Sequence, residues 1–222
     1  SGKLNASLCL WLLLAQLLLM IHGFEDLVCR VIATICHFLW LAVFSQMSAI
    51  AVNMALTFYR ITPIVSLDAA ARFKRLTIVA LTPPMVIVAV CTGLDVGLTN
   101  GMLKVGYGTS LCSWISNDME TIVIFFYTPV CLSLVINFVC FVITLCGIEK
   151  STKASSMVSH DTTRSERRKC VIYTKLSSIM GFTWITGIIA AILEYPALWY
   201  IYIILNGLQG FFIFLSFICN RR

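Results

Sequence analysis

Six long runs of apolar residues constrain this chain more than any other feature. They cover residues 4–21, 31–59, 76–94, 121–145, 171–193 and 197–219, and Lys175, close to one end of its run, is the only Asp, Glu, Lys or Arg in them. About 20 consecutive apolar residues in a helix are enough to cross the hydrocarbon core of a bilayer, which is about 30 Å thick. We therefore predict an all-α fold, a polytopic transmembrane helical bundle with six spans.

The composition agrees with a protein embedded in lipid. Hydrophobic residues make up 59% of the chain and charged residues 12%, whereas a soluble domain has about 45–50% and about 25%. The connections between the spans are short, so we predict a single transmembrane domain over residues 1–222, multi-pass in the plasma membrane.

The basic residues predict the orientation of the spans. One side of the membrane receives 14 of the 16 Lys and Arg residues, and such an excess marks the cytoplasmic side. Both ends of the chain then lie in the cytoplasm. Because the chain opens with Ser1 and its first residues look like the tail of a cytoplasmic loop, we expect that a span precedes it.

Two cysteines stand apart from the other eight. Cys29 lies at the predicted outer mouth of the second span, and Cys112 lies in the long outer loop after the third. They are the two cysteines in the oxidising compartment, where disulfides persist. A Cys29–Cys112 disulfide would tether the loop over the bundle, and the alternative is two free thiols.

Polar side chains inside the spans indicate faces that avoid lipid. In the last span, Asn206, Gln209, Gly210 and Ile213 follow helical spacing and form one stripe. Such a stripe predicts close packing against other helices, with the amides bonding across the interface. Packing alone is a sufficient explanation for it.

Two further spans show the same kind of pattern. In the second span, Gln46 and Asn53 are seven residues apart, among small residues, which predicts a central helix. In the fifth span, Trp184 lies between Gly181 and Gly187, so it is either a conformational switch or a core side chain.

Three prolines lie inside the runs. Pro83 and Pro84 interrupt the third run and Pro129 the fourth. A proline inside a helix removes an amide donor, so we predict kinked or loosened helices there.

The spans contain no catalytic constellation. They have no carboxylate pair and no Gly-x-Ser-x-Gly motif, and the histidines at 22, 37 and 160 are scattered. We therefore predict no enzyme activity, no metal, no cofactor and no nucleic-acid partner. Ionisable groups near the midplane, common in transporters, are also absent from the sequence, which leaves a transporter of a neutral solute as an alternative.

Three motifs resemble the membrane region of adhesion-type G-protein-coupled receptors, in the secretin-like class that includes Methuselah-like receptors. The stretch 8-LCLWLLLAQLLLM-20 is similar to the second helix of that family, 181-GFTWITGIIA-190 to the sixth and 204-ILNGLQGFFIFL-215 to the seventh. Cys29 and Cys112 match its disulfide and Trp114 its loop tryptophan. The resemblance implies a seven-helix receptor from which the first helix is missing here.

The resemblance also implies a mechanism. A peptide agonist, often tethered, enters the outer half of the bundle and shifts it to a state that binds a heterotrimeric G protein. The positions that match the agonist pocket and switch are Trp114, Trp184, Asn206, Gln209 and Gly210. In the second span the family often reads Phe-x-Trp-Met-Leu-x-Glu-Gly, whereas this chain reads 44-FSQMSAIA-51, with Gln46 in place of the tryptophan.

A signalling receptor is thus the first hypothesis. The loops that would face a G protein and the anionic lipid of the inner leaflet carry Arg60, Arg72, Lys74, Arg75, Arg167, Arg168 and Lys169. A transporter for a neutral solute and a nonsignalling truncated membrane protein are the alternatives.

Overall fold

The computed structural model describes residues 2–20, 26–59, 69–97, 105–108, 119–155, 183–187, 189–190, 193 and 195–208. Its elements are α1 (Gly2–Leu19), α2 (Asp26–Tyr59), α3 (Ala69–Gly97), α4 (Met119–Ile122), the π-helical turn η1 (Val123–Tyr127), α5 (Thr128–Ser155) and α7 (Pro196–Gly207). Throughout these ranges the regular structure is helical, which confirms the predicted all-α class.

Three of the described helices are long and apolar enough to cross a membrane. They are Leu27–Leu56 in α2, Ala71–Gly97 in α3 and Glu120–Gly147 across α4, η1 and α5, and a shorter apolar helix covers Ala6–Leu19. These four agree with the first four predicted spans. Most of the fifth span and the end of the sixth lie outside the described residues, so the count of six stays a prediction.

The second and third predicted spans are shorter than the helices α2 and α3 that correspond to them. The second span was expected to start at residue 31, whereas α2 starts at Asp26, and the third was expected over 76–94, whereas α3 covers Ala69–Gly97. A helix rises about 1.5 Å per residue, so the 34 residues of α2 extend for about 51 Å. The apolar runs mark the part of each helix in lipid, and the helices continue beyond it.

The chain divides into two compact units. Unit 1 comprises residues 1–53 and 63–136, and unit 2 comprises residues 54–62 and 137–222. Unit 1 thus holds α1, α3, α4, η1, most of α2 and the first part of α5. Unit 2 holds the end of α2, the rest of α5, the described residues between 183 and 193, and α7.

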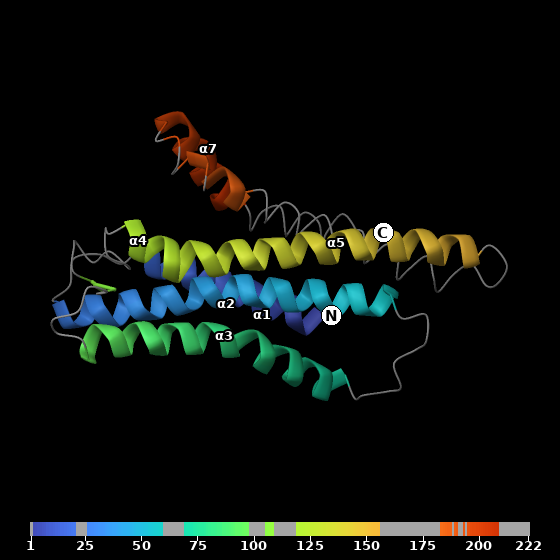
Figure 1. Ribbon diagram of the computed structural model, residues 1–222, viewed down its shortest axis with the longest axis horizontal. Helices are drawn as coiled ribbons and strands as arrows, with labels where there is room; N and C mark the ends of the chain where they lie inside the picture. The colour runs from blue at the N-terminus through green and yellow to red at the C-terminus, as the bar shows by residue number, and fades with distance from the viewer. Residues whose placement is uncertain are drawn as a thin grey trace. The chain divides into compact units, whose positions relative to one another are not determined.

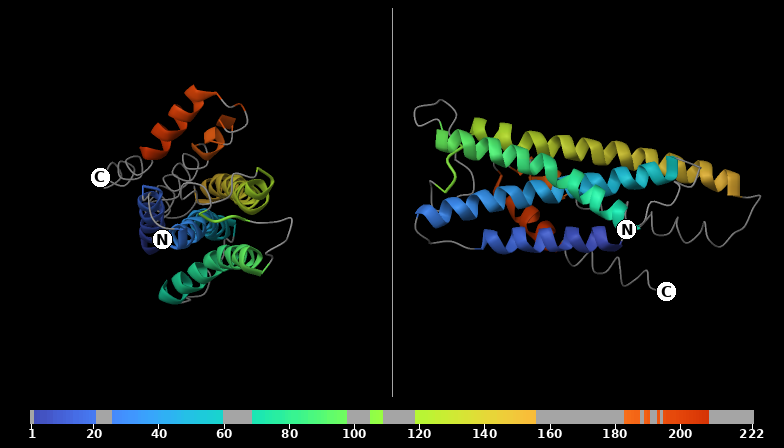
Figure 2. Two further views of the ribbon diagram at one scale, coloured as in Figure 1. Left: turned by 90° about the vertical axis from the view of Figure 1, so that its left-hand side faces the viewer. Right: turned by 90° about the horizontal axis from the view of Figure 1, so that it is seen from below.

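Within unit 1, α2 lies between α1, α3 and the first part of α5 (Figures 1 and 2). In its most apolar window, 56% of α2 is buried, compared with 22% for α3 and 17% for the segment that ends in α5. Gln46 and His37 are both fully buried in it. The central position that the small and amide residues predicted for this helix is confirmed.

The prolines affect their helices in two different ways. Pro83 and Pro84 lie inside α3, which is drawn with its teal first part bent away from the line of the green remainder (Figure 1). Pro129 is the second residue of α5, and only Thr128 separates it from the π-helical turn. Short π-helical turns interrupt α-helices where the regular hydrogen bonding is disturbed, so the predicted loosening takes the form of η1.

Candidate functional site

A short loop segment, residues 105–108, is fixed against one end of unit 1. The carboxylate of Asp95, near the end of α3, accepts hydrogen bonds from the backbone N–H of Gly106 at 2.9 Å and of Tyr107 at 3.3 Å. Val105 and Tyr107 are buried, with exposed fractions of 0% and 2%. The segment is therefore part of the packed unit. We call this region, where α2 begins and α3 ends, the Cys29 end.

Tyr107 reaches a histidine inside the bundle. Its hydroxyl oxygen lies 2.6 Å from Nδ1 of His37, and Nε2 of the same ring lies 3.2 Å from the carbonyl oxygen of Phe125 in η1. A carbonyl oxygen can only accept, so Nε2 carries a proton, and in the neutral ring Nδ1 accepts the hydroxyl proton of Tyr107. We call these two bonds the Tyr107–His37–Phe125 link.

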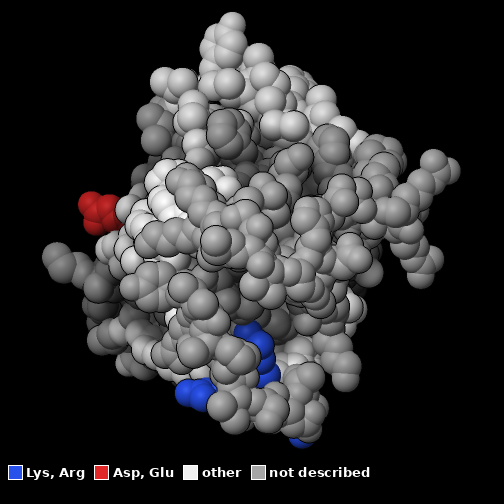
Figure 3. Space-filling view, turned by 90° about the vertical axis from the view of Figure 1, so that its right-hand side faces the viewer, with Lys and Arg blue, Asp and Glu red and all other residues white. Residues whose placement is uncertain are grey.

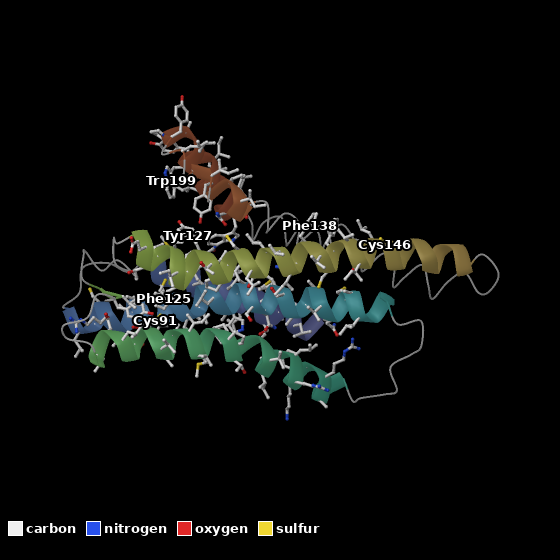
Figure 4. All side chains as sticks on the ribbon, viewed as in Figure 1. Cys91, Phe125, Tyr127, Phe138, Cys146 and Trp199 are labelled. Carbon is white, nitrogen blue, oxygen red and sulfur yellow. The ribbon has the colours of Figure 1, made fainter. Side chains whose placement is uncertain are left out.

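The surroundings of the link are apolar and closely packed. The His37 ring contacts Phe126 with centroids 6.3 Å apart, and the thiol of Cys91 in α3 lies close to the Tyr107 hydroxyl. Figure 4 shows Cys91 and Phe125 at the same end of the helices. Burial, with Cys91 and Asp95 adding to it, raises the pKa of the Tyr107 hydroxyl, which therefore keeps its proton at neutral pH and can donate.

Gly108 brings the loop segment onto the backbone of α2. Its φ is +70°, and a Cβ atom added to it would lie 2.8 Å from the nitrogen of Arg30 and 2.9 Å from the carbonyl carbon of Cys29. Only glycine tolerates both the left-handed conformation and this approach. Cys29 is 2% exposed and disulfide-bonded. Cys112 lies outside the described residues, so the Cys29–Cys112 pairing stays a prediction.

Sequence reasoning missed His37 and Tyr107. The scattered positions of the histidines excluded a shared metal site, and no other role was assigned to His37. The signal was present, because an ionisable ring inside an otherwise uncharged run has to find partners. Within the described ranges, no group of three or more His, Cys, Asp or Glu side chains is arranged to hold a metal ion.

The opposite end of unit 1 holds a second polar contact. Arg72 donates from Nε at 3.0 Å and from a terminal guanidinium nitrogen at 2.5 Å to the Oδ1 atom of Asn53 in α2. Figure 3 shows Lys and Arg side chains gathered over one part of the face it displays. We call the region around this pair the Arg72 end.

The expectation that Arg72, Lys74 and Arg75 lie in a loop was wrong. All three are helical residues of α3, because this helix starts at Ala69. Lys74 and Arg75 are exposed, whereas Arg72 is partly buried against Asn53. The other predicted basic positions, Arg60, Arg167, Arg168 and Lys169, lie outside the described residues.

Two predicted switch residues of unit 2 converge on Tyr202 of α7. The ring of Trp184 packs edge-on against the Tyr202 ring, with centroids 5.9 Å apart. Asn206 donates from Nδ2 to the carbonyl oxygen of Tyr202 at 3.3 Å. This bond lies within one helix, which differs from the predicted bonding across an interface. Oδ1 of Asn206 has no partner among the described residues.

Gly187 belongs to the same contact. A Cβ atom at this position would lie 2.5 Å from a ring carbon of Tyr202. The position of this glycine indicates a packing role, since it provides the space for the tyrosine ring. Trp114, Gln209 and Gly210, the other predicted pocket residues, lie outside the described residues.

Gln46 is an unusual core residue. It is 0% exposed, and neither the oxygen nor the nitrogen of its amide has a hydrogen-bond partner among the described residues. A buried polar group without a partner costs about 1–3 kcal/mol.

Comparison with known families decides what this bundle is. Residues 3–213 match the family model described as 7 transmembrane receptor (Secretin family). The chain belongs to the secretin family of seven-transmembrane receptors. It is therefore a receptor and not an enzyme, and a multi-pass membrane protein.

Individual relatives agree with this membership. The receptor is 30% identical over 222 residues to "Adhesion G protein-coupled receptor E2" of Homo sapiens, and this alignment covers 98% of the chain and 26% of the relative. It is 30% identical over 137 residues to "G-protein coupled receptor Mth2" of Drosophila yakuba, and this alignment covers 56% of the chain and 25% of the relative. The chain thus spans about a quarter of the length of these relatives. Both the adhesion-type and the Methuselah-like resemblances are confirmed.

Proposed function

We propose that this receptor couples a peptide agonist, free or tethered, to a heterotrimeric G protein across the plasma membrane. The observation that carries the proposal is the match of residues 3–213 to the receptor family, together with relatives whose names describe them as G-protein coupled. The agonist would approach the Cys29 end, and the G protein would bind at the Arg72 end.

The chemistry of the two ends supports this assignment. At the Cys29 end the buried loop segment 105–108 and the disulfide-bonded Cys29 are fixed in place. A surface with fixed side chains suits the recognition of a ligand. At the Arg72 end the exposed side chains of Lys74 and Arg75 suit acidic surfaces and the anionic inner leaflet. Trp184 and Asn206, which meet at Tyr202, are the switch residues of the proposal.

G-protein activation in cells tests the proposal. We expect Trp184→Ala and Asn206→Leu to lower agonist-stimulated nucleotide exchange on Gα at least tenfold, while the amount at the cell surface falls less than twofold. Ile203→Leu, at a position of α7 that is 59% exposed, serves as a control for the general effect of a substitution on signalling and surface expression. Equal losses of signalling and surface expression would show that both residues have only a packing role. If the receptor stimulates nucleotide exchange on no Gα class, the signalling proposal is wrong and the nonsignalling alternative holds.

The proposed orientation needs its own experiment. Epitope tags fused to both ends of this chain should be detected only after cells are permeabilised, whereas a tag inserted after Gly108 should be detected on intact cells. Tags at the two ends that appear on opposite sides would contradict the six-span arrangement.

A further inference from the structure

The carbonyl oxygen of Phe125 in η1 cannot accept the usual α-helical hydrogen bond from the residue four positions later. In an α-helix the N–H of residue 129 would bond to the carbonyl oxygen of Phe125, but residue 129 is proline and has no N–H. His37 of α2 supplies the donor instead, with Nε2 at 3.2 Å from this oxygen. A side chain of another helix thus replaces the missing bond.

The same turn has the wider π-helical spacing. The N–H of Thr128 bonds to the carbonyl oxygen of Val123, five residues earlier, and the Thr128 hydroxyl donates to the same oxygen at 2.8 Å. An α-helix would pair residue 128 with residue 124. Conversion of this turn to α-helical register would rotate the preceding residues by about 100° relative to α5, because one residue corresponds to about 100° of helix.

The present register decides which side chains face the bundle. Thr121 and Phe126 are buried, with exposed fractions of 2% and 4%, whereas Ile124 is 51% exposed. A rotation of about 100° would move these side chains out of their present positions. An α-helical turn at this place would therefore pack differently from the π-helical one by a discrete step.

We propose that the Tyr107–His37–Phe125 link holds this turn in the π-helical register, so that the loop segment 105–108 controls which residues of α4 and η1 face the bundle. The hydroxyl of Tyr107, 2.6 Å from Nδ1, fixes the orientation of the imidazole, and the oriented imidazole satisfies the Phe125 carbonyl. π-Helical turns are rare and persist where their surroundings support them. Loss of the hydroxyl removes that support, and a population with the turn in the α-helical register appears.

A distance measurement tests this inference, which goes beyond the proposed signalling function and needs no G protein. Nitroxide labels are introduced as unnatural amino acids at Ile124 in η1 and at Val31 in α2, both of which are more than half exposed. The distance between them is measured by pulsed electron paramagnetic resonance in nanodiscs. A side chain that swings by about 100° on a helix about 10 Å wide moves on the order of 8 Å.

Tyr107→Phe should add a population in which the label distance has shifted on that scale. Tyr127→Phe is the matched control, since it makes the same chemical change within η1 but leaves the link intact, and it should keep the original distance. Pro129→Ala restores an N–H donor to the Phe125 carbonyl, so it should favour the shifted population by itself. Addition of Tyr107→Phe to Pro129→Ala should then change nothing further.

Two results would overturn the inference. One is a Tyr107→Phe protein with the same distances as the Tyr127→Phe control. The other is a pair of shifts, from Tyr107→Phe and Pro129→Ala, that add in the double variant. Should Tyr107→Phe fail to reach the membrane, His37→Phe takes its place, because it removes both hydrogen bonds of the link, and an unchanged distance in it rejects the link as the element that sets the register.

Discussion

The hydroxyl of Tyr107 lies 2.6 Å from Nδ1 of His37, although 70 residues separate them in the chain. The other nitrogen of the same ring bonds to a carbonyl oxygen 88 residues away, in η1. One buried imidazole thus joins the second helix to the loop segment and to the π-helical turn. Three parts of unit 1 depend on a ring that is 0% exposed.

Replacement of this ring by an apolar one should destabilise the protein. In His37→Phe the Tyr107 hydroxyl and the Phe125 carbonyl both lose a buried partner, and each unsatisfied group costs about 1–3 kcal/mol. We expect a lower thermal midpoint of the purified protein in detergent, measured by a thiol-reactive fluorescent dye. Ile35→Leu, at a position that is 43% exposed, is the control. Equal midpoints for the two variants would show that the ring contributes only its shape.

Gly108 should not tolerate even a methyl group. Gly108→Ala combines a φ of +70° with a Cβ contact of 2.8 Å to the backbone nitrogen of Arg30, so the loop segment has to move away from α2. We expect at most a third of the wild-type amount at the cell surface. Gly93→Ala in α3 is the control, because a Cβ there meets nothing within 4 Å and alanine is a better helix former by about 1 kcal/mol. A similar surface level for both variants would contradict the close approach.

Gly187 and Tyr202 should behave as a coupled pair. Gly187→Ala places a Cβ atom 2.5 Å from the tyrosine ring, and overpacking of this kind typically costs about 1–3 kcal/mol. Tyr202→Ala in the same protein removes the clash, so the double variant should be more stable than the sum of the two single effects. Thermal midpoints of all four proteins give the coupling free energy. Strictly additive effects would separate the two residues, and Gly207→Ala, with open space around its Cβ, controls for the added methyl group.

Arg72 should contribute to stability without any G protein present. Two of its nitrogens bond to Oδ1 of Asn53, and a hydrogen bond that involves a charged group is worth about 1.5–3 kcal/mol. Arg72→Ala should therefore lower the thermal midpoint of the purified protein. Lys74→Ala, at an exposed position of the same helix, should change stability by less than about 0.5 kcal/mol. If the two variants have the same stability, Arg72 acts only as a surface charge.

Much of the architecture could be predicted because lipid imposes it locally. A chain in hydrocarbon has to satisfy its backbone within each segment, so an uncharged run of 18 or more residues becomes a helix. The positions of α1, α2, α3 and the α4–η1–α5 segment followed from this rule, as did the burial of Gln46. The ends of the helices did not follow, because lipid acts only on the part that it surrounds. Arg72, Lys74 and Arg75 continue α3 into water, where the apolar pattern carries no information.

The sequence by itself determined that this chain is a helical membrane protein, and its motifs identified the receptor family. Only the tertiary structure showed that Tyr107 meets His37, that His37 replaces the amide which Pro129 lacks, and that Gly187 holds the ring of Tyr202. Hydropathy and helical spacing describe the neighbourhood of each residue along the chain. A hydrogen-bond partner 70 or 88 residues away depends on how whole helices pack, and no local pattern encodes that distance.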